Sequence, residues 1–411
     1  MNQCSCRKVR QSVASGLLIC TALAALALPI RAHAQFTGTA SATGQFESNS
    51  NVYALQYGTV QPGSNDSRRS DTYYSYGAEL DGNYSWGRQQ FHATANAHQF
   101  DYQHFTQLNH NDYSVDAGLN WKLGDRLVGG LDIVRTHTMV PLYDLTGSAR
   151  VSSSLTNQQE TAQIGIKLSS DWRVEGSATT SKGEQPIPGA PNLQLTQTTG
   201  TTSIEYVGIG GLTSGLTAAY LSGDYSGSNV TINPSFTQET LGFLANYKLS
   251  RTTVEGQLGY SRRNSDTGRD NTSGVTGALD LKHQLTPKTS FTVKIDRAIK
   301  SYYLNSGSEI DTDASVGVNW QATYKLTVSL SYMFNYRDFP RQGNDPVNSD
   351  RIDRQQFATL GIYYQPRRWL TIRPYANLQT RRSNFIGGDY NATVFGVYVT
   401  VSTPNKGVRG R

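Results

Sequence analysis

The stretch that decides the fold lies near the C-terminus, where residues 361–379 read GIYYQPRRWLTIRPYANLQ. Apolar side chains occupy even positions before the Gln-Pro-Arg-Arg cluster and even positions again after it. Such alternation is typical of a β-strand with one apolar face, and a short polar cluster that contains proline predicts a turn. We therefore predict two amphipathic strands joined by a tight turn at Pro366-Arg367. Because Pro374 cannot donate a ladder hydrogen bond, a bulge or a local defect is expected in the second strand.

The same alternation recurs along the chain, notably in residues 71–86, 112–123 and 326–337. Each apolar face is apolar in its middle and carries aromatic residues toward at least one end. Strands of a soluble sandwich are usually about five or six residues long, which is much shorter than these runs. In these long strands, the aromatic residues lie where the interfaces of a bilayer would be, which favours a transmembrane barrel. In such a barrel, apolar side chains face lipid and polar side chains face a lumen.

Long polar segments and tight turns alternate between the strands. Their number predicts 18 antiparallel strands and thus an all-β, up-and-down barrel. The alternation is weak in residues 156–182 and 195–207, which leaves 16 strands as the alternative. The sheet is expected to close, because an open edge in hydrocarbon leaves backbone groups unpaired. The long segments are 48–70, 106–111, 141–155, 183–194, 227–236, 264–271, 302–308, 340–351 and 385–388, and the turns lie near 87–88, 124–125, 170–171, 208–211, 250–251, 286–287, 325 and 366–367.

The N-terminus has the features of a secretory signal peptide. A basic segment that contains Arg7 and Arg10 precedes an apolar run, and Ala32-His33-Ala34 forms an A-x-A cleavage site. A lipoprotein site at Cys20 is the alternative. Cleavage after Ala34 would leave one barrel domain, residues 35–411, with a short polar C-terminal tail.

Removal of residues 1–34 changes the composition in two ways. All three cysteines lie in this segment, so no disulfide or thiolate metal site is expected in the remaining chain. The remaining 33 basic and 31 acidic residues give a net charge of +2, so the high pI is no argument for nucleic-acid binding. The remaining chain contains no run of about 18 apolar residues, so no helical membrane span is expected.

Residues 40–55, 70–105 and 112–135 carry a set of local features. An Asn-rich segment ends in Asn-Val-Tyr after the first strand, Ser-Asp precedes the second, an Arg-Gln-Gln-Phe turn follows, and Trp-x-Leu-Gly precedes a Gly-rich strand. These features resemble the outer-membrane β-barrel family encoded in exopolysaccharide-biosynthesis operons, the EpsL family, which is grouped with β-barrel porins. The resemblance implies the outer membrane as location and a part in exopolysaccharide biosynthesis or export. It implies no catalytic residues.

Charged and aromatic residues on the predicted lumen face are candidate contacts for a solute. The guanidinium of Arg373 could pair with a uronate carboxylate, and Tyr375 could stack on a pyranose ring. The alternative is that a wet lumen simply carries charges, and that the tyrosines fill space or belong to a girdle. The candidates are Arg373, Tyr375, Arg337, Glu79, Asp81, Asp116 and Tyr73, with Lys122, Arg381 and Tyr363 on the same face.

Enzymatic and metal sites are weakly indicated. Ser75, Asp81 and a histidine at 92 or 98 could form a Ser-His-Asp arrangement, but neighbouring strands of a Ser-rich barrel supply such triples by chance. His104 and His110 have no carboxylates at ligand spacing. We predict no enzyme, no metal and no cofactor.

The first long segment, 48–70, could fold inward as a constriction, bind polymer outside or remain a mobile surface loop. Two function classes follow. The first is a porin-like channel that assists exopolysaccharide export or admits small solutes, and the second is a non-conducting barrel that anchors an export complex. Expected partners are outer-membrane lipid, exopolysaccharide and proteins of the export machinery, and no nucleic acid.

Overall fold

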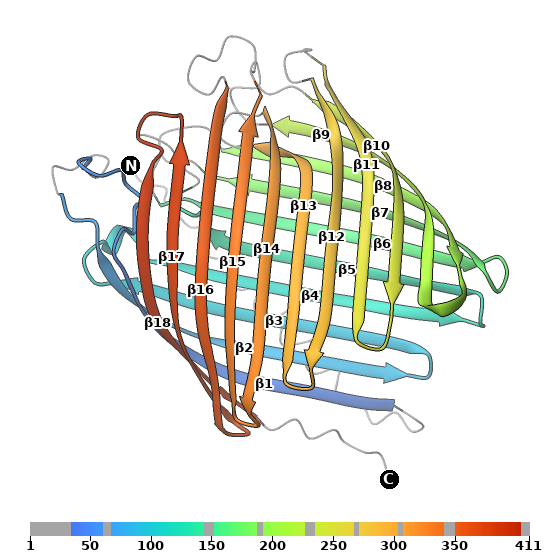
Figure 1. Ribbon diagram of the computed structural model, residues 1–411, viewed down its shortest axis with the longest axis horizontal. Coiled ribbons are helices and arrows are strands. Elements are labelled where there is room, and N and C mark those ends of the chain that lie inside the picture. The colour runs from blue at the N-terminus through green and yellow to red at the C-terminus, as the bar shows by residue number, and fades with distance from the viewer. Residues whose placement is uncertain are drawn as a thin grey trace, which may run out of the picture.

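The computed structural model describes residues 34–60, 67–143, 152–186, 192–226, 235–266, 271–302, 307–340 and 350–403. Most of them belong to 18 strands of one antiparallel sheet (Figure 1). The strands are β1 (Ala34–Asn49), β2 (Asp71–Trp86), β3 (Gln89–Tyr102), β4 (His110–Leu123), β5 (Leu127–Met139), β6 (Ser154–Lys167), β7 (Trp172–Gln185), β8 (Leu193–Val207), β9 (Leu212–Ser226), β10 (Phe236–Lys248), β11 (Thr252–Ser265), β12 (Thr272–Thr286), β13 (Thr289–Tyr302), β14 (Gly307–Thr323), β15 (Leu326–Phe339), β16 (Arg351–Arg367), β17 (Leu370–Ser383) and β18 (Tyr390–Ser402).

The sheet closes into a barrel. Each strand pairs with its neighbours in sequence, and β1 pairs with both β2 and β18. The predicted all-β, up-and-down barrel of 18 strands is confirmed, and the 16-strand alternative is wrong. Within the described residues, no helix is long and apolar enough to cross a membrane.

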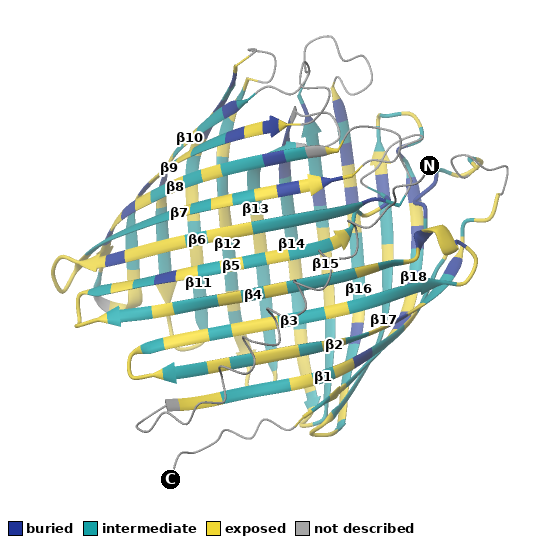
Figure 2. Cartoon of the chain, turned by 180° about the vertical axis from the view of Figure 1, so that it is seen from behind, coloured by how far each residue is buried: buried dark blue, intermediate teal, exposed yellow. Residues whose placement is uncertain are grey.

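Apolar side chains point outward. Leu241 is 67% exposed and Leu258 64%, and they belong to a wide group of exposed Leu, Ile, Val and aromatic residues on the strands. Figure 2 shows exposed and half-buried residues alternating along most strands, with buried residues concentrated toward the strand ends. A continuous apolar exterior of this kind is unstable in water and marks a surface that lipid covers.

The short connections gather at one end of the barrel, which we term the turn end. Gly87 and Gly124 have positive φ of 61° and 59°, so two of these turns use a conformation that favours glycine. The turn predicted at Pro366-Arg367 lies slightly later in the chain, between Arg367 and Leu370. β16 continues to Arg367 after a register shift that begins at Tyr364, because a bulge accommodates the proline before the chain reverses.

Pro374 produces a local defect without a bulge. Its pairing with Val397 of β18 is in register. On the β16 side, the register is the same before and after the proline, but no pair is formed between Gly361–Tyr375 and Tyr364–Ile372. The missing N–H of proline explains why the ladder is interrupted on one side only.

The opposite end, which we term the loop end, holds the tightly packed apolar residues of the barrel. One cluster joins the β1–β2, β3–β4 and β5–β6 connections through Tyr53, Leu55, Phe105, Leu108 and Leu142. A second joins Ala54 to Tyr390 and Ala392 of β18, with Tyr143 against it. These connections and the start of β18 therefore pack against one another at the loop end.

Candidate functional site: the luminal wall from β16 to β3

An aromatic wall lines the lumen over six adjacent strands, from the turn-end part of β16 and β17 to the loop-end part of β1 to β3. It consists of Tyr363 on β16, Arg373 and Tyr375 on β17, Tyr398 on β18, Gln45 and Glu47 on β1, Tyr73 and Glu79 on β2, and His98, Phe100 and Tyr102 on β3. These side chains face the lumen because successive side chains of a strand point to opposite faces. Their neighbours in the strands, such as Tyr74 and Phe395, are exposed on the outer face.

Tyr375 reaches across a whole strand to meet Glu47. Gly396 of β18 pairs with Tyr375 on one side and with Glu47 on the other. A Cβ at Gly396 would lie 2.5 Å from the tyrosine ring, so glycine is what allows the ring to cross. The Tyr375 hydroxyl then donates a short hydrogen bond to Glu47.

Gln45 ties the centre of the wall together. Its Nε2 donates to the Tyr375 hydroxyl at 2.6 Å and to the Tyr73 hydroxyl at 3.2 Å. The Tyr73 ring lies 5.0 Å from Tyr102 and 5.7 Å from Phe100 between ring centroids. Amide, carboxylate and hydroxyl groups thus lie between aromatic faces, which is the mixture that sugar hydroxyls and pyranose faces require.

The cation of the wall is Arg373. Its guanidinium carbon lies 4.7 Å above the centroid of the Tyr363 ring. Its Nε is buried and has no hydrogen-bond partner among the described residues. The Arg373 guanidinium thus combines a face stacked on tyrosine with N–H groups of the kind that pair with anionic or polar groups.

Glu79 and Tyr398 form the next level toward the turn end. The Tyr398 hydroxyl donates to Glu79 Oε1 at 3.1 Å, and His98 Nε2 lies 3.8 Å from the same oxygen. His98 also lies 3.0 Å from the Thr43 hydroxyl. The structure therefore brings together four of the predicted candidates, Arg373, Tyr375, Tyr73 and Glu79, in one wall.

The β5–β6 connection reaches across the loop end to this wall. Five strands separate β5 from β17 around the barrel. Nevertheless the Tyr143 carbonyl accepts a hydrogen bond from Arg381, and the Tyr143 ring lies 6.0 Å from Phe357 of β16. Arg381 is completely buried, donates also to the Gly388 carbonyl and lies 5.2 Å above the Tyr390 ring. It therefore anchors the start of this connection, up to Tyr143, across the loop end.

The described part of the first long segment packs under this loop. Asn51 accepts from the Leu55 N–H and donates to the Leu55 and Asn391 carbonyls. Tyr53 is buried against Phe105, with ring centroids 5.1 Å apart. Residues 51–55 of this segment pack onto the rim, whereas Tyr57 is 95% exposed and residues 61–66 lie outside the described residues.

Asp71 organises the neighbouring β3–β4 connection. Its carboxylate accepts from the backbone N–H groups of Phe105 and His104 and lies 3.0 Å from His104 Nδ1. Burial raises the pKa of this carboxyl, but these hydrogen bonds outweigh burial and hold the pKa below its usual value. Asp71 lies above the exposed Tyr74 and Tyr76 of β2, so it belongs to the rim and not to the lipid-facing belt. The Asn-Val-Tyr and Ser-Asp features of the sequence therefore build the rim.

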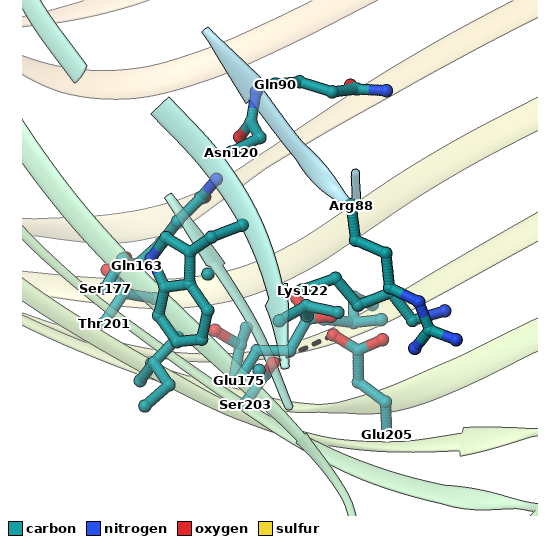
Figure 3. Close-up of a pocket in the computed structure, with 18 of the residues that line it drawn as sticks. Arg88, Gln90, Asn120, Lys122, Gln163, Glu175, Ser177, Thr201, Ser203 and Glu205 are labelled. Carbon is teal, nitrogen blue, oxygen red and sulfur yellow. Dashed lines mark hydrogen bonds between the residues drawn. The ribbon is translucent and has the colours of Figure 1, made fainter. Parts of the chain in front are cut away.

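A second concavity lies on the luminal wall from β3 to β11, near the turn end (Figure 3). This cavity of about 670 Å³ is lined mainly by polar side chains, among them Gln90, Asn120, Gln163, Ser177 and Thr201. Lys122, one of the predicted lumen charges, lines it together with Arg88 and Glu205. The amide lining had no sequence signal beyond alternation, because the strands concerned are those with the weakest apolar faces.

The remaining candidates lie apart from the aromatic wall. Asp81 accepts from the Thr39 hydroxyl at 3.1 Å. Asp116 lies 3.2 Å from His92, which is also 3.2 Å from Asp132. Arg337 pairs across the sheet with the buried Asp311 and Asp353, in a charged ladder on β13–β16 that also holds Lys300.

The imagined catalytic triple does not form. Ser75 donates to Gln45, whereas the carboxylates nearest His92 and His98 come from Asp116, Asp132 and Glu79. His104 contacts Asp71, and His110 stacks on Phe100 at 4.6 Å. In the described parts of the chain, no group of three or more His, Cys, Asp and Glu is arranged to hold a metal ion.

Comparison with known proteins gives one family match. Residues 247–403 match the family described as "Putative beta-barrel porin 2", which covers β11 to β18 and less than half of the chain. No curated protein matches the chain.

Several solved structures are similar in shape. The FrpB iron transporter from Neisseria meningitidis (F3-3 variant) has 11% identity and a TM-score of 0.48, with 90% of this chain and 81% of that chain covered. The outer membrane protein OpdK from Pseudomonas aeruginosa has 10% identity and a TM-score of 0.48, with 89% and 99% covered. The ferric enterobactin receptor PfeA of Pseudomonas aeruginosa has 10% identity and a TM-score of 0.46, with 91% and 82% covered. Beyond the barrel fold, the comparisons show that the C-terminal strands of this chain are similar to a porin family.

Proposed function

We propose that the protein is a porin-like channel of the outer membrane that assists the export of an exopolysaccharide. The observation that carries this proposal is the aromatic wall, in which Tyr375, Tyr73 and Tyr398 alternate with Glu47, Glu79 and Arg373. A sugar chain offers weakly polar ring faces and many hydroxyls, and this wall presents aromatic faces with hydrogen-bonding groups at their edges. Arg373 adds a preference for sugars that carry a carboxylate.

Three further observations support a conducting pore. A barrel of 16 to 18 strands is wide enough for an aqueous channel. The luminal cavity on the adjoining wall is lined mainly by polar side chains, as Figure 3 shows, and lies toward the turn end. The start of the β5–β6 connection is anchored across the loop end, which places Tyr143 at the ends of the strands that carry the aromatic wall.

The second candidate is a non-conducting barrel that anchors an export complex. It is favoured by the apolar packing of three loop-end connections around Leu108 and Leu142, both of which are buried. The two candidates differ in whether the packed loops leave a path beside them. A general small-solute porin would leave a path but show no preference for sugar polymers.

The test is single-channel conductance of refolded residues 35–411 in a planar bilayer, with and without the secreted polysaccharide of the host. We expect a steady conductance that the polysaccharide blocks and that a neutral polymer of equal size, such as dextran, blocks less. Silence from a protein shown to be folded would favour the anchoring barrel. Conductance without any block by the polysaccharide would favour the small-solute porin.

A further inference from the structure

The outer face of β6 to β9 differs from the rest of the exterior. At mid-height, where other strands carry Leu80, Leu258 or Leu330, these strands carry Ala162, Gly176, Gly200, Thr202 and Ala218, and all but Gly176 are exposed. The result is a groove of about 810 Å³, bounded on one side by Tyr220, Leu241 and Tyr260. Small side chains on a membrane-facing surface allow another backbone to approach closely.

Charged residues line the loop-end side of this groove. Glu239 and Arg262 line the groove itself and pair across β10 and β11. Glu160 pairs across the sheet with Ile133, which is itself 54% exposed on the outer face, and its Oε1 accepts from Gln158 at 2.9 Å. Glu160 therefore lies beside an apolar side chain of the lipid-facing belt. A carboxylate at the border of this belt is stabilised by a polar or charged partner.

The signs of the charges distinguish two candidate partners for this surface, which are an anionic lipid and a second protein surface. Arg135 and Lys182 are exposed on the same outer face, together with Glu184 and Asp224. Counted with Glu160, Glu239 and Arg262, the patch has three cations and four anions. A lipid with a strongly anionic headgroup would meet more anions than cations, whereas a mixed patch of this kind can pair with itself.

We propose that this surface, the groove with its charged border on β5 to β11, binds a second copy of the same chain. An isologous contact places the cations of one copy against the anions of the other, and the small residues allow the two sheets to pack closely. The surface faces outward, so this contact leaves the luminal aromatic wall unobstructed. The proposal relies on the barrel lying in a membrane but not on what passes through it.

The experiment measures the mass of refolded residues 35–411 in a mild detergent by native mass spectrometry and light scattering. We compare wild type with Ala218→Trp, which fills the groove, and with Ala97→Trp, which makes the same change on the exposed outer face of β3. We expect a dimer or larger assembly for wild type and Ala97→Trp, and a folded monomer for Ala218→Trp. Circular dichroism verifies that both variants keep the barrel.

Three results would overturn the proposal. The first is a monomeric wild type in detergent and in lipid nanodiscs. The second is equal dissociation by the two tryptophan variants. The third is a monomer that binds added lipopolysaccharide and no longer binds it in Ala218→Trp, because that would assign the groove to a lipid. The mass is independent of conductance, so failure of this proposal and failure of the channel proposal can be told apart.

Discussion

The luminal wall from β16 to β3 and the wall from β6 to β9 are built from the same alternating strands but carry different chemistry. The first has aromatic residues on its inner face, such as Tyr375, and large apolar residues on its outer face, such as Leu80. The second has amides and hydroxyls inside, such as Gln163, and small residues outside, such as Ala218. The difference teaches that alternation fixes the fold, whereas the size and aromatic character of each position decide what the wall contacts.

The loop end of the β16–β3 wall is covered by connections that pack against one another. Arg381 holds part of this cover, because it is buried and donates to the Tyr143 carbonyl. We expect Arg381→Ala to give the largest effect. Loss of the guanidinium removes a donor from two carbonyls, at a cost of about 1–3 kcal/mol, and frees the start of the β5–β6 connection from its anchor. Single-channel conductance should rise on the order of twofold.

The control for this prediction is Arg382→Ala. Arg382 is the next residue, with its side chain 64% exposed and in contact with Asp389 at 3.5 Å. Its removal should leave conductance unchanged. Equal conductance of the Arg381 and Arg382 variants would contradict the view that this loop sets the width of the mouth.

The aromatic wall is tested next by Tyr375→Ala. We expect the polysaccharide to block the current about tenfold more weakly, which corresponds to a lost contact of about 1.4 kcal/mol. Tyr364→Ala removes a tyrosine that is 42% exposed on the outer face of β16 and should not change the block. If both variants reduce the block alike, the inner face has no special role in binding.

A smaller effect is expected from Gly396→Ala. The new methyl group would lie 2.5 Å from the Tyr375 ring and displace it from Glu47. Gly44→Ala on β1 is the matched control, because a Cβ there has nothing within 4 Å. Current block by the polysaccharide should weaken in the first variant and remain in the second. An unchanged block in Gly396→Ala would show that the position of the ring is unimportant.

The smallest effect concerns pH at the rim. The pKa of Asp71 is lowered in the folded protein, so its contribution to stability is present above the unfolded pKa of about 3.9 and is lost as pH falls through the lower folded pKa. Hydrogen exchange at the Phe105 amide should therefore remain slow from pH 7 to pH 5. Asp71→Asn should speed this exchange at neutral pH, and an equally slow amide in the variant would refute the role given to the carboxylate.

Much of the barrel could be predicted from sequence, because alternation and turn residues are local signals. The strand order, the inner placement of Arg373 and Tyr375 and the defect at Pro374 follow from parity and from the chemistry of proline. The crossing of Tyr375 over Gly396 could not, since it depends on register between strands far apart in the sequence. The anchoring of Tyr143 by Arg381 was likewise hidden, because a loop that spans the mouth leaves no periodic pattern.

The central claim is that saccharide chains pass along the aromatic wall, and its most direct test is flux. Proteoliposomes are loaded with a fluorescent oligosaccharide cut from the secreted polymer, and its release is compared with that from protein-free vesicles. The account predicts release that is faster with wild-type protein, faster still with Arg381→Ala and slower with Tyr375→Ala. Retention of the oligosaccharide in vesicles that readily release small ions would contradict it.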